Sequence, residues 1–177
     1  MTTFILTLVM MAGLFLLLWG AVGFVQDKRF FTTAPKEIQE TALPKPERFK
    51  GQHILGWAML ILALAMMLGA VIFGAWDGIR NGFSFSQFFI RNLIMLWGMK
   101  AFDIAVFDWF LLCHSNFFPL YFPEVKSIVD PHLFGYNWRS HLKEILAHIL
   151  VSLLIAFICT VRFCHFAHCL SECLQWA

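Results

Sequence analysis

Apolar residues are grouped along the chain into four long stretches, separated by shorter polar segments. The first two contain no charged residue, and each of the four has the roughly 20 residues that a helix needs to cross the hydrocarbon core of a bilayer. Backbone polar groups must be satisfied internally in lipid, which favours helices there. The pattern predicts an all-α polytopic integral membrane protein, a four-transmembrane-helix bundle that forms one domain over residues 1–177. The expected spans are about 4–24, 54–75, 88–112 and 142–161.

The first apolar stretch has the organisation of a retained span and not of a cleaved signal peptide. A signal peptide carries positive charge before its apolar run. In this chain the basic residues Lys28 and Arg29 follow the run instead. We therefore expect the stretch to remain in the protein as a helix.

The composition favours a membrane environment and gives no indication of a nucleic-acid partner. Hydrophobic residues make up 60% of the chain and charged residues 14%, so the chain is more apolar and less charged than a typical soluble domain. The formal net charge is only +2, and the basic residues gather beside the apolar stretches, not along one polar face. The lipid bilayer is the expected partner, and nucleic acid is not.

Lys and Arg residues predict which loops face the cytoplasm. Six of them lie in the segment 25–52, which we expect to be an interfacial loop with a short helix near Pro35. The segment before the fourth span adds more, and it is apolar yet broken by prolines, which favours an interfacial or re-entrant path. The positive-inside rule then places these two loops in the cytoplasm and both termini outside, in a plasma or cytoplasmic membrane.

The third span carries ionisable residues at positions that hydrocarbon would surround. Lys100 lies near its middle, Asp103 follows at i+3, and Asp108 lies near its end. Each charge costs several kcal/mol in lipid unless it is paired or hydrated. With 100° per residue, Asn92, Lys100 and Asp103 share one helix face. Asp108 then points about 140° away from Asp103 and needs a partner of its own.

Two interpretations of these residues stay open. Lys100 and Asp103 form either a self-contained ion pair that only fixes helix packing or part of a hydrated, ion-binding path. In the second case the candidate substrate- or ion-binding residues are Lys100, Asp103, Asp108 and Asn92.

The fourth span begins with a polar face that offers Asp108 a partner. His141, Glu144 and His148 are spaced by three and four residues, so they share one side of a helix at a depth similar to that of Asp108. Carboxylates and imidazoles together can perform acid–base chemistry or hold a divalent metal. They are also common at a helix entry, where they simply meet the interface. The catalytic candidates are Asp108, His148 and Glu144.

The tail 162–177 is dense in potential metal ligands. His165, His168 and Cys169 would lie on one side of a continuing helix, as zinc or copper sites require. No Cys-x-x-Cys pair is present, so the spacing matches no zinc finger. The alternative is an amphipathic extension in which the cysteines act as small hydrophobic residues.

Three functional hypotheses follow. The first is a membrane protein that handles an ion, a proton or a small solute, or an accessory subunit of a membrane complex. The second is a membrane-embedded enzyme that acts on a lipid or isoprenoid at the cytoplasmic face, with Asp108 and His148 as acid and base. The third is a structural membrane partner. Four helices shield buried charges poorly, so we also expect a homo-oligomer or a larger complex. The sequence indicates no cofactor.

Overall fold

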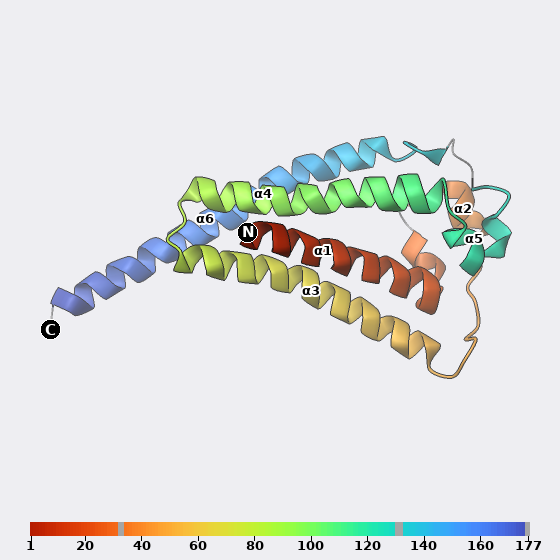
Figure 1. Ribbon diagram of the computed structural model, residues 1–177, viewed down its shortest axis with the longest axis horizontal. Coiled ribbons are helices and arrows are strands. Elements are labelled where there is room, and N and C mark those ends of the chain that lie inside the picture. Colours follow the sequence, from red (N-terminus) through yellow and green to blue (C-terminus); the bar gives the residue numbers. More distant parts are fainter. Residues whose placement is uncertain (32–33, 130–132, 176–177) are drawn as a thin grey trace.

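The computed structural model describes residues 1–31, 34–129 and 133–175, with the backbone alone for 162–175. Within these ranges the chain is helical and contains no strand (Figure 1). Four long helical segments dominate, and two of them change from α to π winding near one end. They are α1 (Thr2–Trp19) with the π-helix η1 (Gly20–Val25), α3 (Gln52–Arg80), α4 (Phe85–Phe102) with the π-helix η3 (Asp103–Leu112), and α6 (Trp138–Gln175).

Three of these segments are long and apolar enough to cross a membrane: Thr2–Val25, Gln52–Arg80 and Trp138–Val161. They agree with the first, second and fourth predicted spans and indicate a membrane location. In the described part of the chain α4 is not among them, because Arg91, Asn92 and Lys100 make it more polar. The third span therefore stays a prediction.

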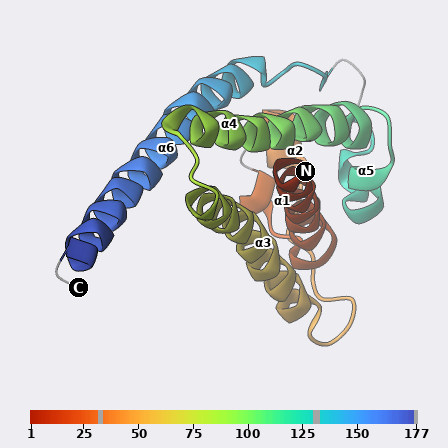
Figure 2. The same ribbon diagram turned by 60° about the vertical axis from the view of Figure 1, so that its left-hand side comes forward.

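The long helices form an open row in the order α3, α1, α4, α6 (Figures 1 and 2). α1 packs between α3 and α4, and α6 packs mainly on α4. α6 also touches α3 near the α3–α4 turn. In the same region Ala156 and Cys159 of α6 lie close to Phe88 of α4. α6 makes no extensive contact with α1 in the described chain. The four-helix bundle that we predicted is therefore not confirmed.

Glycines let the neighbouring helices approach closely. A Cβ atom on Gly56 of α3 would lie 2.7 Å from Val25 Cγ2, and one on Gly98 of α4 would lie 2.6 Å from Thr7 Cγ2 of α1. Real Cβ atoms do not come so near, so both positions require glycine for this packing. By contrast, a Cβ on Gly69 would meet nothing within 4 Å.

The outward sides of α3 and α6 are strongly apolar. Large aliphatic and aromatic side chains on both helices are more than half exposed, among them Ile54, Ile61, Leu68, Leu150 and Phe157. A water-soluble protein rarely exposes such a continuous apolar surface. These faces are suited to contact with lipid or with another protein.

The two loops at the far end of the row pack together into one structure, here called the loop cap (residues 26–31, 34–51 and 113–129). It holds the short helices η2 (Lys28–Phe31), α2 (Lys36–Thr41), α5 (Phe117–Tyr121) and η4 (Pro123–Val125). Ile38 of α2 is buried against Phe122 and Val125 of the second loop. The short helix expected near Pro35 is confirmed as α2, which begins directly after that proline.

An ion pair joins the two halves of the loop cap. Lys45 Nζ lies 2.7 Å from Glu124 Oε2, and the Leu43 N–H donates to Glu124 Oε1 at 3.1 Å. Partial burial alone would raise the pKa of the Glu124 carboxyl, but these hydrogen bonds outweigh it and lower that pKa below its usual value. The ionised carboxylate therefore stabilises the contact between the loops.

Candidate functional site

Lys100 is the buried centre of an ion network between α4, η3 and α6, in which the side chain of Glu144 is 42% exposed. Its ammonium Nζ donates to Asp103 Oδ2 at 2.6 Å and to Glu144 Oε2 at 2.5 Å. The side chain of Lys100 is only 7% exposed, so its charge depends on these two carboxylates. Ser140 Oγ donates to the other oxygen of Glu144 at 3.1 Å. Lys100 and Asp103 thus form the predicted i,i+3 pair, but the pair is not self-contained, because Glu144 of α6 completes it.

The π winding of η3 places Asp103 and Asp108 on the same side of the helix. Both carboxylates line one small cavity of about 80 Å³ next to α1. Our expectation of about 140° between them assumed α-helical winding and is wrong for this segment. A π-helix bonds residue i to residue i+5, so side chains five apart lie close to one face.

Asp108 pairs with His141 at the start of α6. His141 Nε2 lies 2.7 Å from Asp108 Oδ2, and both side chains are largely buried. The atoms are close enough for an ion pair when the imidazole is protonated, although their angle is not that of a directed hydrogen bond. Of the two histidines predicted near Asp108, His141 is the one in contact.

Lys100, Asp103, Asp108, His141 and Glu144 are called the charged cluster below. The cluster contains three carboxylates but only one ammonium group. Tyr136 nearby is affected by it: burial first, and then the negative charges of Asp108 and Asp103, raise the pKa of its hydroxyl. The cluster therefore has an excess of negative charge unless an imidazole or a carboxylate takes up a proton.

The polar side of α6 continues beyond the cluster. His148 Nδ1 and Ser152 Oγ are buried and find no hydrogen-bond partner among the described residues, and the same holds for His141 Nδ1. Buried polar atoms of this kind are normally satisfied by ordered water. His148 lies one helical turn after Glu144 on α6. Among the described contacts, Asp108 pairs with His141 and not with His148.

Asn92 does not join the cluster. Its side-chain amide donates to the Phe88 carbonyl at 2.8 Å, one turn earlier in the same helix. Eight residues of helical rise place it about 12 Å from Lys100 along the axis. Asn92 is buried, as predicted for that helix face, but it satisfies its own backbone.

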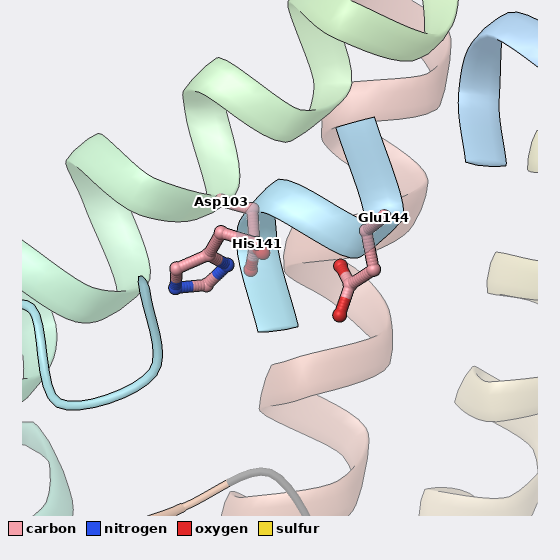
Figure 3. A group of neighbouring side chains, drawn as sticks. All are labelled: Asp103, His141 and Glu144. Carbon is pink, nitrogen blue, oxygen red and sulfur yellow. The ribbon is translucent and has the colours of Figure 1, made fainter. Parts of the chain in front are cut away.

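Asp103, His141 and Glu144 are close enough to hold a metal ion by distance alone (Figure 3). One ligand atom from each lies within 4.8 Å of the others. However, Lys100 Nζ contacts both carboxylates and already occupies the position of a cation. A divalent ion would meet the repulsion of this ammonium, so the cluster suits a proton or a monovalent charge better. The predicted ligands His165, His168 and Cys169 belong to the tail, whose side chains lie outside the described part of the structure.

A groove of about 400 Å³ opens between η3 and the beginning of α6, next to the Asp108–His141 pair. Its walls are almost entirely apolar, and the two polar side chains form one corner. The lining residues are Ile104, Asp108, Phe134, Gly135, Trp138, His141, Leu142 and Ile145.

A second buried ion pair joins α3 and α4, and the sequence analysis missed it. Arg91 Nη1 lies 2.8 Å from Asp77 Oδ2 and donates to the Gly74 carbonyl at 2.8 Å. The guanidinium also lies 4.1 Å from the centre of the Phe83 ring. Asp77 lies near the end of α3 and Arg91 near the start of α4, on the two sides of one short turn, and this placement of opposite charges was the available signal.

Comparison of the chain with protein-family models, with curated proteins and with solved structures gives no match to any of them. The functional argument therefore rests on the geometry of the charged cluster and the groove.

Proposed function

We propose that this chain is a polytopic membrane protein that handles protons or other monovalent cations at the charged cluster. The observation that carries the proposal is the excess of carboxylates over ammonium groups in a largely buried helix interface. Ionised groups are costly in such surroundings unless they are paired. Lys100 pairs with the carboxylates of Asp103 and Glu144. The third carboxylate, Asp108, lies beside His141 and can therefore gain or lose a positively charged partner.

The Asp108–His141 pair is suited to proton exchange. A carboxylate and an imidazole 2.7 Å apart can share or pass a proton. Further along α6, His148 and Ser152 also have buried polar atoms without a hydrogen-bond partner among the described residues, and ordered water normally satisfies such atoms. Such a hydrated side of the helix would connect the pair to solvent.

Proton flux into liposomes tests the proposal. The purified protein is reconstituted with an internal pH-sensitive dye, and flux is driven by a potassium diffusion potential. We expect Asp108→Asn to reduce the flux at least ten-fold. Asp27→Asn is the matched control, because it makes the same change at a partly exposed carboxylate of the loop cap, outside the charged cluster. Equal flux in wild type, Asp108→Asn and protein-free liposomes would overturn the proposal.

The membrane topology belongs to the same proposal. Four spans, with α4 and η3 as the third, would leave the basic loops at one end of the row and both chain ends at the other. The packing of these loops into the loop cap supports this. We assign the loop cap to the cytoplasmic side. Cysteines introduced at the exposed positions Lys50 and Asn81 should react with an impermeant maleimide from opposite sides of the membrane. Labelling of both from one side would contradict the assignment.

A second candidate function is a membrane enzyme that acts on a lipid or isoprenoid, and the groove favours it. An acid–base pair beside an apolar groove of this volume is a common arrangement for such a site. His141, not His148, would then be the partner of Asp108. Incubation with membrane lipids and mass spectrometry of the products separates the two functions. Asp108-dependent conversion of a lipid, without proton flux, would favour the enzyme.

A purely structural partner would need Lys100 and Asp103 to be satisfied by each other alone. The bond from Lys100 to Glu144 argues against this alternative. We keep an oligomer or a larger complex as part of the proposal, since the open row leaves α6 covered on one side only. Light scattering of the protein in detergent tests it, and a monomer would contradict it.

A further inference from the structure

The groove between η3 and α6 combines apolar walls with one ionisable corner. Phe134, Trp138 and Leu142 form much of its rim, and each is about half exposed. Asp108 and His141 lie at its polar corner and are largely buried. A ligand that fills this groove must therefore be mainly apolar and carry one polar or charged centre.

The formal charge of the cluster is negative, because with His141 neutral its three carboxylates outnumber the single ammonium group. Lys100 Nζ is already bonded to the carboxylates of Asp103 and Glu144. It lies on the helix that leads to Asp108 but makes no bond to it among the described contacts. Asp108 therefore faces the groove paired with His141, and the charge of Lys100 acts on it without a direct bond. This corner attracts a positive charge and repels an anionic head group.

The aromatic rim favours the same sign of charge. Trp138 and Phe134 line the groove, and the faces of aromatic rings attract cations that have lost part of their hydration. The guanidinium of Arg139 already lies 5.6 Å from the centre of the Trp138 ring, so this ring accepts a cation in the structure itself.

From these observations we propose that the groove binds hydrophobic organic cations, with Asp108 as the counter-ion and Trp138 as an aromatic wall. The inference rests on the proposed cation-handling function and names the class of solute that would exchange with the proton. A hydrophobic cation would enter from the lipid side and take the place of the positive charge that the cluster lacks.

Two probes of nearly the same size and shape but opposite charge test the inference. Binding of tetraphenylphosphonium and of tetraphenylborate is measured by equilibrium dialysis against the protein in nanodiscs, with protein-free nanodiscs as the blank. We expect the cation to bind to the wild type at least ten-fold more tightly than the anion. Equal affinity for both probes would overturn the inference, and this comparison needs no variant to fold.

Variants locate the binding. We expect Asp108→Asn to weaken binding of the cation at least ten-fold, Asp108→Glu to retain most of it, and Trp138→Ala to weaken it about three-fold, which corresponds to the loss of one cation–π contact. The control Asp27→Asn should bind like the wild type. Unchanged binding in Asp108→Asn would overturn the assignment of the groove.

Combined with the flux assay, these measurements separate the inference from the function on which it rests. Proton flux that depends on Asp108, without binding of tetraphenylphosphonium, overturns the inference and leaves the proposed function in place. Binding that depends on Asp108, without any proton flux, supports the groove assignment and removes the proton from the proposed function.

Discussion

A double-mutant cycle between Lys100 and Asp103 measures how strongly the buried ion pair stabilises the fold. The single variants are Lys100→Met and Asp103→Asn, and the double variant carries both changes. The cycle compares the free energy of unfolding of the double variant with the sum of the single effects, which isolates the pair interaction.

The expected magnitude follows from the geometry. At 2.6 Å and an effective dielectric constant of about 20, the attraction between two unit charges is about 6 kcal/mol. Desolvation of the buried groups costs several kcal/mol and offsets most of it. We expect Lys100→Met alone to destabilise by about 3 kcal/mol, because it leaves carboxylates facing one another. The coupling energy should be about 2 kcal/mol, so the double variant is more stable than additivity implies.

The chain offers a more exposed pair as the matched control. Arg29 Nε lies 3.3 Å from Asp27 Oδ2, and the side chains are 87% and 31% exposed, respectively. The cycle with Arg29→Met and Asp27→Asn should give a coupling energy of about 0.5 kcal/mol or less. Unfolding is followed by tryptophan fluorescence during titration of a mild detergent with SDS. A coupling for Lys100 and Asp103 that is no larger than in the control would refute the argument that burial makes this pair strong.

Three further outcomes are expected from the same unfolding assay. Gly56→Ala should destabilise by about 2 kcal/mol, because its Cβ would overlap Phe24 and Val25 of η1, whereas Gly69→Ala should be neutral or slightly stabilising. Equal effects at both glycines would contradict the close contact between η1 and α3. The lowered pKa of Glu124 means that its contribution to stability is fully present above the usual pKa of a glutamate carboxyl and is lost as the pH falls below that value and through the lowered pKa of the folded state. Glu124→Gln should reduce this acid dependence of loop-cap stability, measured as protease sensitivity at pH 7 and pH 4, and an unchanged dependence would count against the ion pair. Arg91→Met should destabilise by about 3 kcal/mol, because it leaves a carboxylate of α3 without its partner, and a loss below about 0.5 kcal/mol would show that this pair is weak.

The periodic apolar stretches predicted the long helices well, because burial in an apolar medium dictates both their length and their composition. The i,i+3 spacing of Lys100 and Asp103 was sufficient to indicate their ion pair, and the polar side of α6 indicated residues that could meet Asp108. The bond from Lys100 to Glu144 was not predicted. The partner of Asp108 was named only as one of several residues at similar depth. Its identity depends on the rotation of α6, which the sequence alone does not determine.

Two features escaped prediction for physical reasons. A rotation of 100° per residue holds for α-helices, and nothing in the residues 103–112 signals π winding, since tertiary contacts decide it. The loop cap depends on contacts between residues far apart in sequence, such as Lys45 and Glu124. Local patterns describe each of these loops as interfacial but do not indicate that they bind each other.

The winding of η3 has a consequence for how this protein can vary in length. Between Asp103 and Asp108 the helix behaves as if one residue had been inserted into an ordinary α-helical turn. A natural variant that lacks one residue there could return to α winding and still keep both carboxylates on one side, four positions apart. A substitution that restored α winding without such a deletion would swing Asp108 away from α6. A deletion of one residue between Asp103 and Asp108 is therefore compatible with an intact site. An alignment of distant relatives should allow a gap of one residue at this point.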